Sequence, residues 1–155
     1  MAEREELINQ ESFQELLKAM EEKKRILLVG QPGAHGLLTL SMALLMHGDD
    51  NGLQYELFDA ALARDRKGSG KQYFAQLRST GDIYKLLSLW AQGDSGVAAI
   101  YANSVDEATD WIEAVLKKGG IREPEAFFNC TVDVICMIEN DGDSSVVTDV
   151  IVLHH

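Results

Sequence analysis

Residues 30–36 form a glycine-rich segment, Gly-Gln-Pro-Gly-Ala-His-Gly, which follows a short apolar run and precedes a longer one. Glycines in such a turn let backbone amides close around phosphate groups, so the segment predicts a phosphate-binding loop. In a working loop of pattern G-x-x-x-x-G-K-[ST], lysine contacts the β and γ phosphates and a hydroxyl holds magnesium. The candidate binding residues are Gly30, Gly33, His35, Gly36, Thr39 and Arg78.

The loop lacks the side chains that hydrolysis requires. Aligned without gaps from Gly30, it has Gly36 at the lysine position and Leu37 at the hydroxyl position. With one residue inserted, Leu37 takes the lysine position and Thr39 falls one residue beyond the hydroxyl position. Losing a single such contact typically lowers the rate of phosphoryl transfer by about 100- to 1000-fold. We therefore expect no catalytic residue here, no metal site and no cofactor, although helix amides still allow weak binding of ATP or ADP. His35 either presents an imidazolium to a phosphate or is an exposed loop histidine without a chemical role.

The elements that position this loop alternate along the chain. The apolar run 26–29 predicts a strand buried on both faces, and 37–46 predicts a buried helix after the loop. Further strands are expected at 53–58, 73–77, 97–101 and 132–138, and further helices at 13–22, 83–90 and 105–117. A turn at 140–143 and an apolar run at 146–152 predict an antiparallel hairpin at the C-terminal end. This order favours an α/β fold with a mostly parallel sheet covered on both faces.

Composition restricts the class of protein and its partners. The length of 155 residues and the apolar fraction of 46% indicate one globular domain, residues 1–153. We interpret His154 and His155 as a remnant of a purification tag. The net charge of −11 disfavours direct binding of nucleic acid, whose phosphates would be repelled. The basic cluster at positions 64–78 is interpreted as a solvated loop; it consists of Arg64, Arg66, Lys67, Lys71 and Arg78.

Location is predicted from the same features. No apolar run approaches the roughly 20 residues of a membrane span, so we expect no membrane insertion. The acidic start lacks the order of a secretory signal. Cys130 and Cys136 lie six residues apart in one apolar segment and are predicted to be reduced core thiols. Together these features predict a cytoplasmic protein.

Three segments carry a resemblance to a known family. Residues 24–33 are similar to the strand and loop opening, and 77–79, Leu-Arg-Ser, are similar to the end of a Walker B segment. Residues 98–104, Ala-Ala-Ile-Tyr-Ala-Asn-Ser, resemble an A-T-x-H-A-N-S box. From about residue 12 to 153 the chain thus resembles the type II/type IV secretion and conjugal-transfer ATPases, which are hexameric RecA-like motors. The resemblance implies a three-layer, RecA-like P-loop domain over 1–153, with an N-terminal helix at about 13–22.

Carried over residue by residue, the resemblance implies lost chemistry. Gln76 stands where the family has its catalytic glutamate, and Tyr101 stands where it has histidine. Arg78 is retained, and Asp59 corresponds to an acidic box without its flanking glutamate. The family's N-terminal domain has no counterpart, so the chain resembles a truncated and degenerate member.

The function implied is that of a catalytically inactive homologue, a pseudo-ATPase acting as a binding or regulatory component. Its partner would be a protein, either a secretion-type ATPase or a second copy. The alternatives are a nucleotide-binding sensor and a weak ATPase that uses displaced residues, with Thr39 for the metal, Arg78 for charge and Asp59 as base.

Overall fold

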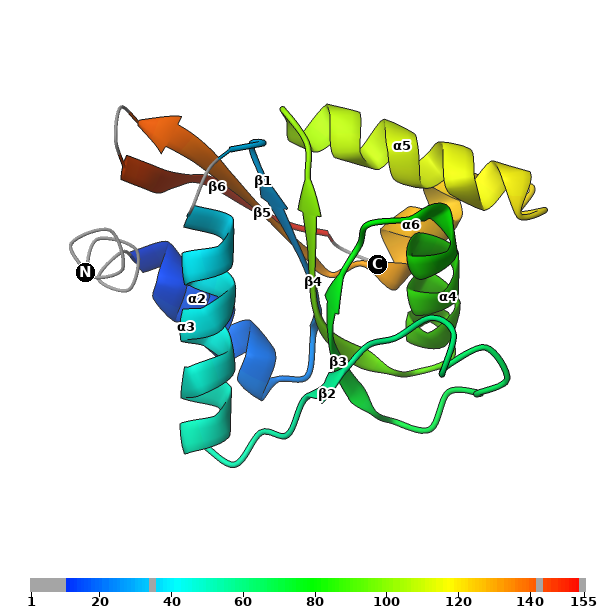
Figure 1. The fold of residues 1–155 in the computed structure, drawn as a ribbon, viewed down its shortest axis with the longest axis horizontal. Coiled ribbons are helices and arrows are strands. Elements are labelled where there is room, and N and C mark those ends of the chain that lie inside the picture. Colours follow the sequence, from blue (N-terminus) through cyan, green and yellow to red (C-terminus); the bar gives the residue numbers. More distant parts are fainter. Residues whose placement is uncertain (1–10, 34–35, 142–143, 154–155) are drawn as a thin grey trace.

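Helices and strands alternate around a six-stranded sheet in the computed structural model of the protein, which describes residues 11–33, 36–141 and 144–153 (Figure 1). The helices are α2 (Glu11–Glu21), α3 (Gly36–Asp50), α4 (Thr80–Ala91), α5 (Val105–Lys118) and α6 (Pro124–Thr131). The strands are β1 (Arg25–Gly30), β2 (Glu56–Leu57), β3 (Gln72–Gln76), β4 (Ser95–Tyr101), β5 (Val134–Asp141) and β6 (Ser144–Val152).

The sheet has the order β2-β3-β4-β1-β5-β6, and among the strands of the described ranges only the β5–β6 pair is antiparallel. The predicted α/β fold, with a mostly parallel sheet and a C-terminal antiparallel pair, is therefore confirmed. The apolar run of β1 is buried on both faces because neighbouring side chains of a strand point to opposite sides. Ile26 and Leu28 pack in one core with α2 and α3, whereas Leu27 and Val29 pack in the other with α4, α5 and α6.

Four details differ from the sequence-based expectation. Helix α6 was not predicted, because its eight residues include Asn, Cys and Thr, which are weak helix formers. Strand β2 has two residues instead of the expected six, and α3 continues to Asp50 instead of ending at residue 46. Cys136 is buried, and this burial raises its pKa to about 12, but Cys130 lies exposed on α6. The prediction that both cysteines are core thiols was therefore wrong for Cys130.

An ion pair anchors the end of the sheet opposite the glycine loop. Arg25 Nε donates to Asp133 Oδ2 at 3.0 Å, and Arg25 Nη2 donates to Asp133 Oδ1, also at 3.0 Å. The backbone amide of Arg25 donates to the same carboxylate at 2.8 Å. This bidentate contact holds the start of β1 beside the segment that leads into β5. It therefore helps to position β1, the strand that leads into the glycine loop.

The loop emerges at the point of the sheet where ligands usually bind in α/β proteins. The helix that follows β1 (α3) packs on one face, and the helix that follows β4 (α5) packs on the other. Because β1 and β4 are neighbours, their carboxyl ends mark a switch point, where the connecting chains diverge and leave a crevice.

Candidate functional site

The carboxyl edge of the sheet brings together several of the predicted residues. Gly30 ends β1, Gln76 ends β3 and Tyr101 ends β4. A small cavity lies between these strand ends and the start of α3, and it is lined by Leu37, Leu38, Ser41, Gln76, Leu77, Arg78, Ala99 and Tyr101. Four of the predicted positions thus share one site, namely Leu37, Gln76, Arg78 and Tyr101. Neither Thr39 nor Asp59 lines it, and His35 falls outside the described residues.

The cavity is too small for a nucleotide. Its volume is about 40 Å³, enough for about one or two ordered water molecules. Pockets for organic ligands typically enclose about 300–1,000 Å³. The described part of this crevice is therefore nearly filled by its own side chains.

Leu37 accounts for much of that filling. It is 2% exposed and belongs to the apolar core beneath α3. A β-carbon added at Gly30 would lie 2.7 Å from Leu37 Cβ, so the leucine packs directly over the first glycine of the loop. In either alignment Leu37 stands where the motif requires a phosphate or magnesium ligand, and its side chain contributes to the core instead.

The glycines of the loop are explained by packing and turn geometry. Gly33 has φ of 83°, a conformation that glycine adopts without strain. A β-carbon on Gly36 would lie 2.2 Å from Ser145 Cβ, so the start of α3 is packed tightly against β6. Turn geometry thus accounts for Gly33, and packing accounts for Gly36.

Contacts with β5 also hold the loop. The Gln31 amide donates to the Ile138 carbonyl at 3.2 Å, and Gln31 Oε1 accepts from the Asn140 amide at 2.9 Å. The Gln31 amide is therefore bonded within the protein and does not point toward a phosphate. These contacts could not be inferred from the sequence, because Gln31 and Asn140 lie 109 residues apart.

Polar side chains at the ends of β3 and β4 are exposed, and those of Gln76 and Arg78 are hydrogen-bonded to each other. The Arg78 guanidinium donates to Gln76 Oε1, and the Arg78 amide donates to Asp82 Oδ2 at 3.1 Å. Tyr101 is 51% exposed. The site therefore offers one cation, one amide, one phenol and the Ser41 hydroxyl, which donates to the Leu37 carbonyl at 2.7 Å, with no carboxylate among the residues that line it. An amide cannot take a proton from an attacking water, so Gln76 cannot act as a general base.

Two solved structures share the architecture of the chain. One is the VirB11 ATPase from the Brucella suis type IV secretion system in complex with sulphate, with a TM-score of 0.68 and 17% identity. The other is the Legionella pneumophila ATPase DotB, with a TM-score of 0.61 and 11% identity. The chain has the fold of these ATPases. The matches cover 91% and 96% of this chain but only 53% and 50% of the two solved chains, so this chain spans about half their length. The sequence matches no family model, and no curated protein matches it significantly.

The displaced residues of the hydrolytic alternative are not assembled at this site. Asp59 Oδ1 accepts from the amides of Ala61 and Leu62 at 2.9 and 3.2 Å, so it stabilises the turn after β2. Strand β2 is three positions from β1 in the sheet, which places their ends roughly 14 Å apart at about 4.8 Å per strand. Asp59 is thus too distant to serve as base for a phosphate at the glycine loop.

The described residues consequently do not fit a magnesium–triphosphate complex. No group of three metal-binding side chains occurs within the ranges that the structure describes. Leu37 fills the position of a required ligand, and Arg78 is the only cation among the residues that line the cavity.

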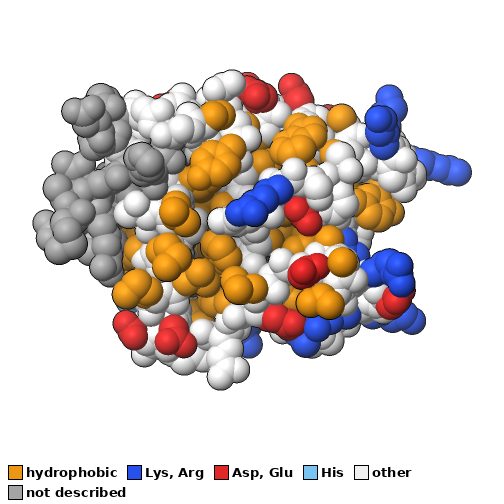
Figure 2. Space-filling model, in the orientation of Figure 1, with side chains coloured by type: hydrophobic (Ala, Val, Ile, Leu, Met, Phe, Trp, Pro, Cys, Tyr) orange, Lys and Arg blue, Asp and Glu red, His pale blue; other side chains and the backbone are white. Residues whose placement is uncertain are grey.

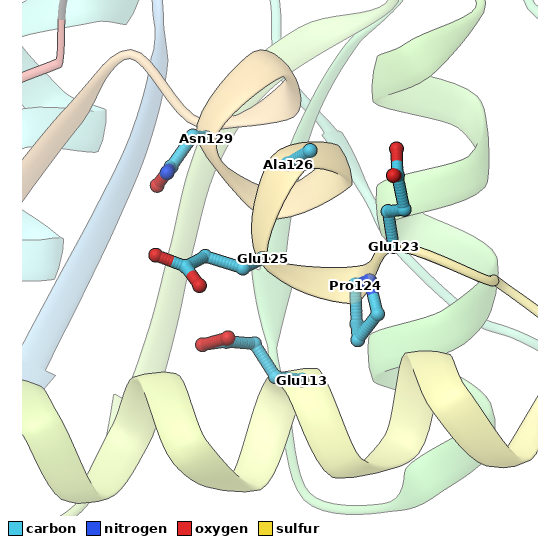
Figure 3. A pocket seen from close by; sticks show the side chains of 6 residues that line it. All are labelled: Glu113, Glu123, Pro124, Glu125, Ala126 and Asn129. Carbon is cyan, nitrogen blue, oxygen red and sulfur yellow. The ribbon is translucent and has the colours of Figure 1, made fainter.

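A larger depression between α5 and α6 is acidic. It has a volume of about 580 Å³ and is lined by Glu113, Glu123, Pro124, Glu125, Ala126 and Asn129 (Figure 3). Desolvation raises the pKa of Glu113, and the negative charges of Glu125 and Asp110 add to this. Figure 3 shows the carboxylates of Glu113 and Glu125 on the same side of the depression. Such a surface repels phosphate and provides no nucleotide site.

The basic cluster at 64–78 is partly neutralised by acidic side chains. Glu56 accepts from Arg66 Nη1 at 2.7 Å and from Lys71 Nζ at 3.1 Å, and these hydrogen bonds lower the pKa of Glu56. Arg64 pairs with Asp65 at 3.8 Å. These pairs support the interpretation of the cluster as a solvated loop. No helix in the described part of the chain is long and apolar enough to cross a membrane.

Proposed function

We propose that this chain is a catalytically inactive homologue of the secretion ATPases and acts in the cytoplasm as a binding or regulatory component. The observation that carries the proposal is the burial of Leu37 over Gly30, at a position where a phosphate or magnesium ligand must stand. A leucine in the core supplies neither charge nor an oxygen ligand, and its packing leaves no room for a lysine to extend from the same backbone.

The rest of the carboxyl edge supports the same conclusion. Catalysis of phosphoryl transfer depends on fixed positive charge and on a group that orients or deprotonates water. Gln76 occupies the end of β3 with its amide oxygen bonded to Arg78. The fold is retained although the chemical groups are changed, which favours a role in binding over a role in turnover.

A nucleotide sensor is the second candidate. Helix α3 has fifteen residues and begins at the glycine loop, so its N-terminal amides attract anions. Arg78 lies on the same edge, and its guanidinium has no acidic partner among the described residues. These two features would support weak binding of a phosphate without hydrolysis.

Binding and turnover are measured on the same sample. The purified protein is titrated with a fluorescent ATP analogue in the presence of magnesium, and phosphate release from ATP is followed in parallel. We expect turnover below about 0.01 per second, two decades below an ordinary enzyme rate of about 1 per second. Binding without turnover would support the sensor.

Variants make the experiment decisive. Turnover above that threshold that is lost in Arg78→Ala or Thr39→Val would overturn the proposal. Arg122→Ala is the matched control, because Arg122 is also an exposed arginine but lies outside the site. If Arg122→Ala lowers turnover as much as Arg78→Ala does, the turnover does not arise from the site.

A further inference from the structure

The outer face of α3 is apolar and exposed. Leu38, Met42 and Met46 recur at intervals of four residues, which places them along one side of the helix. They are 52%, 51% and 49% exposed, respectively. Tyr101, 51% exposed, adjoins Leu38, because both line the small cavity at the carboxyl edge. These four residues are called the α3 stripe. Figure 2 shows apolar side chains gathered over α3, with acidic side chains at its lower end.

The two ends of the α3 stripe carry opposite charges. Asp49 lies eleven residues after Leu38, which returns it to the same side of the helix, and it is exposed. At the other end, Arg78 lines the cavity beside Leu38, and its guanidinium has no acidic partner among the described residues. The helix dipole adds to this polarity, since the N-terminal end of α3 is positive.

A surface with this pattern is complementary to a second copy of itself. If two α3 helices pack antiparallel about a two-fold axis near Met42, Met46 of each copy lies against Leu38 of the other. Asp49 of each copy then reaches the positive end of the opposing α3, beside Arg78. A two-fold contact of this kind pairs one patch with the same patch, so both ion pairs form together.

We propose that the α3 stripe is a self-association surface through which two copies of the chain form an antiparallel, two-fold dimer. The proposal rests on the proposed function, because it names a second copy as the partner in the binding role.

The exposed area indicates a weak dimer. A half-exposed leucine, methionine or tyrosine presents on the order of 100 Å², so the α3 stripe presents roughly 400 Å². A stable interface buries about 800 Å² from each partner. We therefore expect a dissociation constant on the order of 10–100 μM, in the range of transient complexes.

Sedimentation equilibrium from about 1 μM to about 1 mM tests the proposal, since this range brackets the expected constant. The full chain should change from monomer to dimer across these concentrations. Met42→Lys should raise the dissociation constant by about 10-fold or more, because it places two lysines against each other at the two-fold axis. Leu62→Lys is the control, because Leu62 is 76% exposed but lies outside the α3 stripe. It should leave the constant unchanged.

A charge exchange tests the antiparallel geometry. Asp49→Arg and Arg78→Glu should each weaken the dimer, and the double variant should recover it, since the ion pair is then re-formed with its charges exchanged. A protein that stays monomeric up to about 1 mM, far above the expected constant, would overturn the dimer. A dimer unaffected by Met42→Lys, or a double variant weaker than both single variants, would do the same.

Phosphate release measured on the same samples separates the two proposals. A monomeric chain without turnover overturns only the dimer. A dimer with turnover that Thr39→Val abolishes overturns only the proposed function.

Discussion

Replacing Gly36 with alanine distinguishes a glycine kept for packing from one kept for phosphate. Gly36 begins α3, and helix propensity alone predicts that alanine there would stabilise the protein by up to about 1 kcal/mol. The structure predicts the opposite sign. The added β-carbon would lie 2.2 Å from Ser145 Cβ and 2.6 Å from Ser145 Oγ, distances that require a shift of β6 or of the helix.

The magnitude follows from these two opposing effects. Overpacking a buried contact typically costs about 1–3 kcal/mol, and Ser145 is 2% exposed, with little freedom to move. After the helix gain is subtracted, we expect Gly36→Ala to lower the free energy of unfolding by about 1–2 kcal/mol. For a domain of this length, that corresponds to a decrease in Tm of roughly 2–8 °C.

Urea denaturation of a double-mutant cycle provides the assay. Ser145→Gly removes the two nearest of the three atoms that the new β-carbon would meet and leaves Ile138 Cγ2, whose distance would be 3.0 Å. Alone it should cost about 0.5–1 kcal/mol as a glycine within a strand. In the Ser145→Gly background, Gly36→Ala should become neutral or stabilising, which gives a favourable coupling of about 1–2 kcal/mol. Gly81→Ala is the matched control near the start of α4, where the nearest atom to the added β-carbon is Ser79 Oγ at 3.8 Å. If Gly36→Ala proves as stable as Gly81→Ala, or if Ser145→Gly fails to rescue it, the packing explanation is refuted.

Two further predictions concern charged side chains. Asp133→Ala should lower the free energy of unfolding by about 3–5 kcal/mol, because it leaves the largely buried Arg25 guanidinium and the Arg25 amide without their partner. Glu56→Ala removes an exposed carboxylate from two ion pairs and should lower the free energy of unfolding by less than about 1 kcal/mol, measured by urea titration of both variants. Equal losses of stability in the two variants would contradict the structural role given to the Arg25–Asp133 pair. Glu113→Gln should stabilise the protein at neutral pH, because the raised pKa of Glu113 means that folding favours its protonated form. The Tm of the wild type should therefore fall relative to that of the variant as pH rises through the raised pKa of Glu113. The two Tm values should converge below the ordinary glutamate pKa of about 4.3. A Tm difference that does not change with pH would exclude the ionisation of Glu113 as its cause.

Strongly patterned elements were predictable from the sequence. The continuous apolar runs of β1 and β4 indicate strands buried on both faces, and they lie at the centre of the sheet. Helix α5 has a regular apolar face and a capping serine, since Ser104 Oγ accepts from the Glu107 amide at 3.0 Å. Strand β2 was overestimated because it pairs with β3 only at Glu56 and Leu57. Its extent depends on a neighbouring strand and not on its own composition.

The membership of the site was predictable, but its internal arrangement was not. Parallel strands end at one edge, so the sequence could place Gln76, Arg78 and Tyr101 near the start of α3. The direction of the Leu37 side chain depends on packing with residues distant in sequence. The contact of Gly36 with Ser145 depends in the same way on where β6 pairs with β5.

The proposed inactivity and the proposed dimer both depend on the first turn of α3. A motor of this fold needs a cation and a hydroxyl there, which must remain polar and face the ligand. In this chain the turn is apolar on both sides, because Leu37 packs into the core and Leu38 is 52% exposed to solvent. An exposed apolar stripe of this kind marks a surface suited to association. Leu37 therefore supplies no phosphate or magnesium ligand in the proposed function, and Leu38, the next residue, begins the α3 stripe. On this reasoning, a polar residue introduced at Leu38 should weaken the dimer without creating turnover, since Leu37 would still fill the position over Gly30.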